Sequence, residues 1–328
     1  MGDIKKQKNK FLSISFTMAE ILLSLTIIGV VAAITLPSLT GNINEKTWNA
    51  QRKALYARLS QSIALIGSLN NYGEYVGIWS TGSISTITDT AAKAFVTDGL
   101  AKVLKMNNIC DNEHFKDCGV PDKIKRYVND NMPFPKTLYD LNTTFASAFV
   151  FNNATYQNPL PVNTKAMAFE THNKESVVLF YNPRCVASEV VQDYVQPTMC
   201  ANFVYDLNGR KGPNAIGRDI GFITAFYPTD TVVVNVVPCK NRVASQMSSI
   251  KWSNAKSACK TMHGEEARVP NKEEMSALYV NKIFFNIATG GFWTSKLETS
   301  STAYALNFGA GQLRAFATNL SGSVLCVE

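Results

Sequence analysis

The amino-acid sequence predicts an α+β fold in which a long N-terminal helix packs on an antiparallel sheet and a C-terminal α+β module follows. Three observations predict it. An apolar segment at 16–36 leads into an amphipathic pattern, short β-prone runs occupy the middle of the chain, and two helical patterns precede strand-like runs beyond residue 238. The 328 residues are enough for two folded parts.

The segment 16–36 is apolar apart from five polar positions, which are Thr17, Glu20, Ser24, Thr26 and Thr35. A helix of this length covers the roughly 30 Å core of a bilayer, so we expect a transmembrane helix here. Lysines precede it at positions 5, 6, 8 and 10. They predict a single-pass protein with a cytoplasmic N-terminus. Glu20 lies inside the apolar run, where an ionisable side chain indicates a function.

The residues Ser15-Phe16-Thr17-Met18-Ala19-Glu20 and the apolar run to Pro37 resemble the cleavage and methylation motif of type IV prepilins. The resemblance implies that a prepilin peptidase cuts between Ser15 and Phe16 and methylates the new amine of Phe16. Glu20 is then the fifth residue, where pilins carry the glutamate that meets the terminal amine of a neighbouring subunit. Pro37 occupies the place of a helix-bending proline. Ser15 departs from the glycine that usually precedes the cut.

This resemblance implies a pilin-like plan with a leader at 1–15, a transmembrane helix at 16–36, and a helix continuation with a globular head at 37–238. It implies a non-enzymatic subunit of a type IV pilus or type II secretion filament, and the size of the head favours a minor pilin or pseudopilin. The expected location is the bacterial inner membrane, followed by a periplasmic or extracellular filament. The expected partners are other subunits, the prepilin peptidase and the inner membrane.

The helix is predicted to continue from Asn44 to about Leu69 with a second, amphipathic part. Leu55, Leu59, Ile63 and Ile66 recur three or four residues apart, with Arg52, Lys53 and Arg58 placed on other faces. We expect its apolar stripe to pack on the sheet of the head.

The middle of the chain predicts an antiparallel sheet. Its β-prone runs are 145–151, 176–181 and 220–227, and clusters of Asn, Pro and Gly separate them. Residues 90–106 have a helical pattern and are expected to form an accessory helix on the head.

The segment 203–219 is similar to a recurring pseudopilin loop and carries Asp206, Asn208, Asn214 and Asp219. These oxygen donors suit calcium, although no glutamate stands where an EF-hand closes. The other interpretation, which we favour, is a tight turn in which Asp206 and Asn208 make Asx-turns and Gly209, Gly212 and Gly217 adopt positive φ angles. We therefore expect no cofactor, with calcium as the alternative.

Seven cysteines follow the apolar segment, and their spacing indicates disulfides in an oxidising compartment. Cys110 with Cys118 and Cys185 with Cys200 are local pairs that would close loops. Zinc sites would need tighter CxxC pairs.

Residues 239–328 form the predicted C-terminal module. Helices are expected at 252–260 and 272–279, with Asn271 and Glu274 in a capping box, and strands at 291–295, 303–308 and 323–327. The order W-x-x-A-x-x-x-C, R-x-P-x-x-x-E, W-T-S and C-V is similar to bacterial C-type-lectin-like modules. That resemblance implies a Cys259–Cys326 disulfide and leaves Cys239 as the odd cysteine. The calcium-dependent glycan motifs E-P-N and W-N-D are absent.

The sequence also bears on three other classes of function. A pilus-displayed adhesin, binding a surface or glycan through the C-terminal module, is the alternative to a purely structural subunit. Catalysis is disfavoured, because the chain has three histidines and the best pair, Cys259 with His263, is lost if Cys259 is oxidised. Nucleic-acid binding is not expected, since no basic stripe interleaved with aromatics follows residue 15.

Overall fold

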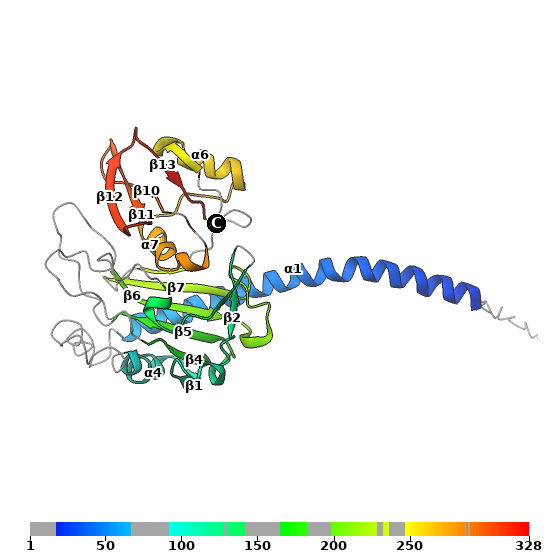
Figure 1. Cartoon of the computed structure of the whole chain (residues 1–328). Helices are drawn as coiled ribbons and strands as arrows, with labels where there is room; N and C mark the ends of the chain where they lie inside the picture. Colours follow the sequence, from blue (N-terminus) through cyan, green and yellow to red (C-terminus); the bar gives the residue numbers. More distant parts are fainter. Residues whose placement is uncertain are drawn as a thin grey trace, which may run out of the picture. The chain divides into compact units, whose positions relative to one another are not determined.

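The computed structural model describes residues 18–66, 92–127, 130–141, 165–182, 198–227, 232–235, 247–285, 287 and 289–327 (Figure 1). The chain divides into two compact units, Met1–Ala50 and Gln51–Glu328. Each unit is described by itself. The protein is mixed α/β, and its described strands form sheets of six, five and two strands.

Helix α1 is one continuous helix of 49 residues, Met18–Ile66. It therefore joins the two helical segments predicted at 16–36 and 44–69. Within the described residues, however, no helix is long and apolar enough to cross a membrane.

This finding corrects two predictions. The transmembrane helix at 16–36, and with it the fold class that included a membrane span, is wrong by this criterion. The single-pass location in an inner membrane depended on that span and is corrected with it.

The head is built on a six-stranded antiparallel sheet of order β1-β4-β5-β6-β7-β8 (Figure 1). The strands are β1 Met106–Cys110, β4 Met167–Thr171, β5 Ser176–Tyr181, β6 Thr198–Asp206, β7 Ile220–Tyr227 and β8 Val232–Asn235. The predicted strands 176–181 and 220–227 are confirmed to the residue. The strand predicted at 145–151 lies outside the described residues.

Short elements surround this sheet. The predicted helix at 90–106 is shorter than expected: Ala92–Ala94 is helical, η1 Phe95–Leu100 is a π-helix, and α4 Ala101–Val103 closes it. Phe95 stacks on Tyr181 of β5 with ring centroids 4.7 Å apart. The remaining elements are η2 Phe115–Cys118, β2 Lys123–Lys125, β3 Asn131–Pro133, α5 Leu138–Leu141 and η5 Gly209–Lys211.

The C-terminal module contains a five-stranded sheet of order β12-β11-β10-β13-β9. Its elements are β9 Met247–Lys251, α6 Trp252–His263, α7 Lys272–Val280, η6 Lys282–Phe284, β10 Gly291–Leu297, β11 Thr302–Asn307, β12 Gln312–Ala317 and β13 Ser321–Val324. The predicted helices and strands are confirmed, with ends displaced by a few residues. The capping box of Asn271 and Glu274 is also confirmed.

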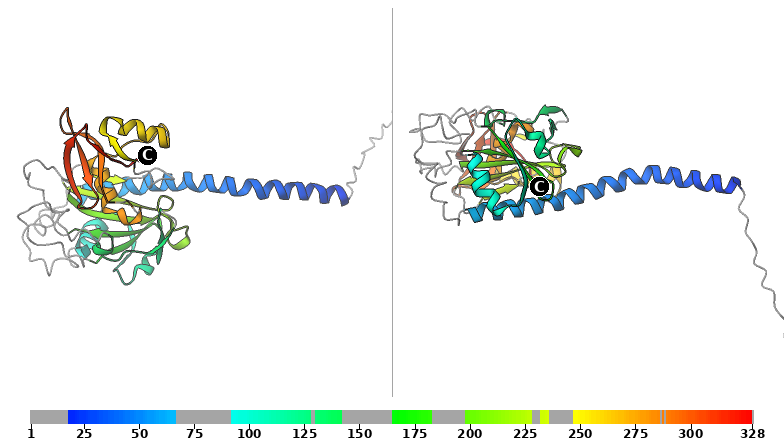
Figure 2. Two further views of the ribbon diagram at one scale, coloured as in Figure 1. Left: turned by 45° about the horizontal axis from the view of Figure 1, so that its top comes forward. Right: turned by 90° about the horizontal axis from the view of Figure 1, so that it is seen from below.

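Helix α7 contacts strands of both sheets, β7 and β8 on one side and β10 and β11 on the other. Its residues 275–280 are buried in a core that includes Phe222 of β7 and Phe292 of β10. In Figures 1 and 2 the part of α1 beyond residue 50 lies along the opposite face of the six-stranded sheet. The head therefore has a helix on each face of its sheet.

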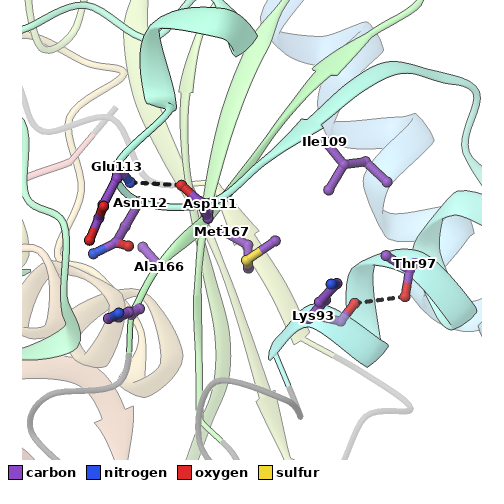
Figure 3. A pocket seen from close by; sticks show the side chains of 9 residues that line it. Lys93, Thr97, Ile109, Asp111, Asn112, Glu113, Ala166 and Met167 are labelled. Atoms are coloured by element: carbon purple, nitrogen blue, oxygen red, sulfur yellow. Dashed lines mark hydrogen bonds between the residues drawn. The ribbon is translucent and has the colours of Figure 1, made fainter.

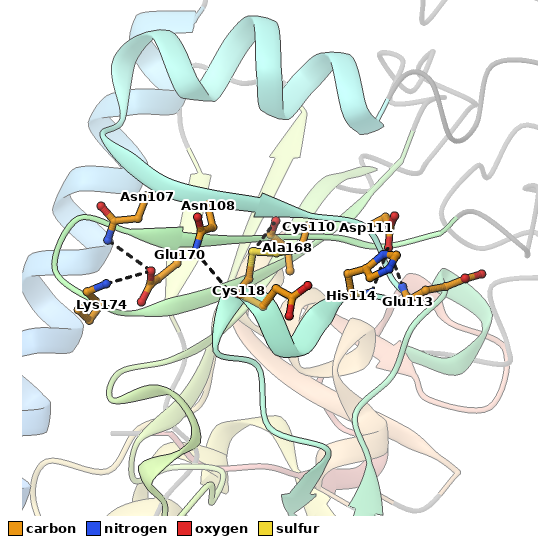
Figure 4. The surroundings of a disulfide bond; sticks show 11 residues. Asn107, Asn108, Cys110, Asp111, Glu113, His114, Cys118, Ala168, Glu170 and Lys174 are labelled. Atoms are coloured by element: carbon orange, nitrogen blue, oxygen red, sulfur yellow. Dashed lines mark hydrogen bonds and ion pairs between the residues drawn. A yellow bond between two sulfur atoms is a disulfide. The ribbon is translucent and has the colours of Figure 1, made fainter.

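Two predicted disulfides are confirmed. Cys110–Cys118 links the last residue of β1 to a cysteine 8 positions further along the chain, as shown in Figure 4. Cys259–Cys326 ties α6 to the residues that follow β13. Cys200 is disulfide-bonded as well, and its predicted partner Cys185, like Cys239, lies outside the described residues.

Candidate functional site

The first part of α1 presents an exposed aliphatic surface. The exposed fractions are 78% for Met18, 62% for Leu22, 61% for Leu25, 57% for Ile27, 64% for Ile28 and 56% for Val30. These positions point all round the helix instead of along one stripe. A helix that is apolar on every side is usually buried, so this surface is suited to packing against other helices.

The predicted processing residues, Ser15 and Phe16, lie outside the described residues. Glu20 and Pro37 fall within α1, and their side chains lie outside the described part. Their roles stay predictions that come from the resemblance.

The loop between β6 and β7 brings the four predicted oxygen-bearing residues into one segment. Asp206 ends β6, and its Oδ1 accepts a hydrogen bond from the backbone N–H of Asn208 at 3.0 Å, which makes an Asx-turn. Gly209, Gly212 and Gly217 have φ angles of 62°, 71° and 80°. The turn geometry predicted for Asp206 and the glycines is therefore confirmed. Asn208 differs, because its side-chain Nδ2 donates to Gly212 O at 2.8 Å.

Asp219 organises the far side of this loop. Its Oδ2 accepts from Asn214 N and its Oδ1 from Ala215 N, both at 2.8 Å. Asp219 is fully buried, and the two charge-assisted bonds hold the backbone that leads into β7.

Three side-chain oxygens of the same loop are buried without a hydrogen-bond partner. They are Asp206 Oδ2, Asn208 Oδ1 and Asn214 Oδ1. Asp206 is 1% exposed, and its pKa is raised to about 8: burial is the largest cause, the nearby charge of Asp219 adds to it, and the hydrogen bonds from Asn208 and Gly209 oppose the rise. Buried oxygens without partners are costly, so these three atoms are available to accept a hydrogen bond from water or to bind a cation.

The donor set of this loop consists of carboxylate and amide oxygens, which hard cations such as Ca²⁺ prefer. In the part of the chain that the structure describes, no three His, Cys, Asp or Glu side chains gather as metal ligands. A cation here would therefore depend on the amides of Asn208 and Asn214 and on backbone carbonyls as well as on Asp206.

Arg52 connects α1 to the loop and was missed from the sequence. We placed it on a polar face of the helix, but it is only 7% exposed. Its Nη2 donates to Gly217 O at 3.2 Å and to Arg218 O at 2.8 Å. The signal that could have found it is its spacing, three residues before Leu55 on the stripe that the head covers.

A second cation of α1 also reaches the head. Arg58 Nη2 lies 2.5 Å from Oε1 of Glu175, which is buried at the turn between β4 and β5. The other carboxylate oxygen of Glu175 accepts from the hydroxyl of Thr171. The buried carboxylate of Glu175 therefore has Arg58 as its ion-pair partner only when α1 is docked.

A pocket of about 540 Å³ lies beside β1 and β4 (Figure 3). Ile109 and Met167 contribute apolar side chains, and the charged groups are Lys93, Lys165, Asp111 and Glu113. Asp111 Oδ1 accepts from the backbone of Glu113 and lies 2.7 Å from Nδ1 of His114 (Figure 4). The pair lowers the pKa of Asp111 and raises the pKa of His114.

The best enzyme pair is removed by oxidation. Cys259, which with His263 was the strongest candidate for a thiolate or a metal ligand, forms the disulfide with Cys326.

Comparison of the sequence with models of known protein families and with curated proteins finds no match.

Proposed function

We propose that this chain is a non-enzymatic subunit, of minor pilin or pseudopilin type, of a type IV pilus or type II secretion filament. One observation carries the proposal: the exposed aliphatic surface of α1 from Met18 to Val30. The occupant that fits it is the corresponding helix of neighbouring subunits, because long apolar helices bury one another by packing side chains between turns.

The motif at the N-terminus supports the same proposal. A free amine at Phe16, made by cleavage after Ser15, would lie close in sequence to the aliphatic surface. The carboxylate of Glu20 would pair with such an amine from the next subunit, and the low dielectric of a helix bundle strengthens that attraction. Prepilin peptidase is the partner that would make the cut.

The processing step is tested on filaments sheared from cells that produce the chain. Mass spectrometry should find a mature N-terminus at Phe16 carrying one methyl group. An intact leader, or a cut near Ala33, contradicts the proposal. Glu20→Ala should abolish incorporation into the filament, while Glu45→Ala, the same change elsewhere in α1, should leave it intact.

The packing surface is tested separately. Leu25→Glu and Ile28→Glu place charges on exposed side chains, so the thermal unfolding of the isolated chain should not change. Incorporation should be lost, because each charge would be buried between helices. Ala50→Glu is the control on the same helix. Normal incorporation of both variants shows that this surface is not the interface.

We also propose that the loop from Asp206 to Asp219 binds calcium, and the observation that favours it is the set of three unpartnered oxygens. A cation bound only by the native state stabilises it, by about 2.7 kcal/mol at a hundredfold excess over Kd. Calcium should therefore raise the melting temperature of the wild type and of Asp117→Asn, an exposed control. Asp206→Asn should remove this rise in melting temperature. If calcium does not raise the melting temperature of the wild type, the loop is only a turn.

A further inference from the structure

We propose that Arg52 and Arg58 set the register of α1 on the head. The apolar contacts stabilise the docked helix, and the two arginines specify which residues of the helix face the loop and the sheet.

The apolar stripe alone does not specify one register. The buried positions of α1 beyond residue 50 are Arg52, Leu55, Leu59, Ser62 and Ile66. If the helix slid by four residues, about one turn, Leu59 would take the place of Leu55 and Ile63 the place of Leu59. Aliphatic side chains would again fill two of the three aliphatic sites, while Asn70 would take the place of Ile66, so burial opposes the slide at only one of these sites.

Arg52 makes the observed register more stable than a shifted one through its contacts with the loop. It supplies one guanidinium to two carbonyl oxygens, Gly217 O and Arg218 O. A slide of four residues would bring Tyr56 or Trp48 to this position. Neither side chain carries a charge, and neither has the several donors of a guanidinium.

Arg58 makes the registers unequal at the sheet. The carboxylate of Glu175 is 5% exposed and pairs with Arg58 across 117 positions of sequence. The same slide would place Ser62 or Ala54 opposite Glu175. A buried carboxylate without its cation is strongly disfavoured, and a slide of four residues in either direction leaves the charge of Glu175 uncompensated.

The register has a consequence for filament assembly, which rests on the proposed function. The register fixes how many helical residues separate the head from the aliphatic surface at Met18–Val30. In a filament built from packed α1 helices, that number would set the distance between each head and the helix core. Arg52 and Arg58 are thus positioning residues for assembly, although they lie outside the proposed interface.

The test replaces half-buried Ile63 of the full-length chain by the photoreactive residue p-benzoylphenylalanine. Mass spectrometry then identifies the head peptides that it cross-links. The wild type and Lys53→Met, which removes an exposed charge from the same helix, should give one set of peptides. Arg52→Met combined with Arg58→Met should add a displaced set whose yield rises by about tenfold or more. An unchanged set in a cooperatively folded double variant overturns the proposal.

Two further variants cover the case in which the double variant does not fold. Glu175→Gln keeps the shape of the side chain and removes the buried charge, and Arg52→Lys keeps a cation but not the fork of donors. Either variant should raise the yield of the displaced set of cross-linked peptides. If both variants give only the wild-type set, the proposal is overturned. Because cross-linking is read on the isolated chain, failure of filament assembly leaves its outcome unaffected.

Discussion

Single side chains carry much of what distinguishes this head from a generic sheet with a helix. Asp206 is held as a buried acid whose pKa is raised to about 8, and Glu175 is held as a buried acid with its own arginine. The two residues lie at the same end of the paired strands β5 and β6, since Ser176, which follows Glu175, is the partner of Asp206. Glu175 forms an ion pair with Arg58, whereas desolvation is the largest cause of the raised pKa of Asp206.

The His114–Asp111 pair yields a pH prediction at this scale. The hydrogen bond and charge of Asp111 raise the pKa of His114 above its ordinary value of about 6.5. The small stabilisation from the pair is therefore present below that value and is lost as the pH rises through the pKa of folded His114. NMR titration of the His114 ring should show the raised pKa.

Asp111→Asn should lower the pKa of His114 toward its ordinary value, because the largest cause of the rise is removed. The control is Asp122→Asn, which removes an exposed acid that pairs with Lys116 instead. If the control moves the His114 pKa as far as Asp111→Asn does, the pair is not the cause.

At the scale of elements, the docked part of α1 depends on a few buried side chains. Leu59 is fully buried, and Leu65 on the same helix is 44% exposed. Leu59→Ala should lower the free energy of unfolding by about 2–5 kcal/mol, because it removes buried methyl groups and leaves a cavity. Leu65→Ala should change it by less than about 0.5 kcal/mol. Urea denaturation measures both, and equal effects would contradict the docking.

The elements were predictable where local pattern decides the structure. β5 and β7 were predicted to the residue because each is an apolar run bounded by turn residues. The capping box of α7 was predictable for the same reason, since Asn271 and Glu274 act within four residues. The Cys259–Cys326 bond came from a resemblance, because spacing alone allows many pairings.

Other features depend on partners far apart in sequence and could not be predicted. Arg52 looked like a solvent-facing charge because its acceptors lie 165 positions away. Asn202 and Asn281 gave no signal at all, since each meets the other only after the sheet and α7 have packed. The oxygen-bearing loop was recognised from its residues, but its three unpartnered atoms are visible only in the structure.

The second unit of the molecule is held together by a buried polar contact as well as by its apolar core. Asn202 of β6 and Asn281 at the end of α7 exchange hydrogen bonds through their side-chain amides, at 2.9 and 3.1 Å. Thr224 of β7 donates to the same oxygen of Asn202 at 2.6 Å. All three are fully buried, so the head sheet and the C-terminal module meet at a specific point.

Replacing one of the two asparagines should lower the stability of the fold more than replacing both. Asn281→Leu leaves Asn202 unsatisfied and should lower stability by about 1–3 kcal/mol, whereas replacing both asparagines by leucine should recover part of the loss. Asn254→Leu, at an exposed position of α6, is the control. Urea denaturation of the two single variants and the double variant gives a double-mutant cycle. Strictly additive changes in the free energy of unfolding would show that the two asparagines do not act as a unit.

The two confirmed disulfides should differ in their contribution to stability. Cys259–Cys326 spans 67 positions and Cys110–Cys118 spans 8. The chain-entropy relation gives about 4 kcal/mol for the longer loop and about 2.5 kcal/mol for the shorter one. Replacing each pair by alanine and comparing urea unfolding checks the order, and a larger loss from the shorter loop would contradict it.

The place of β13 in its sheet has a consequence for biogenesis. β13 lies between β10 and β9, although it is synthesised after every other strand that the structure describes. β9 and α6 emerge from the ribosome long before the strand that joins them to the sheet, and Cys259 precedes its oxidation partner by 67 positions. During that interval its thiol can react with the wrong cysteine, so a disulfide isomerase should speed oxidative folding of the chain.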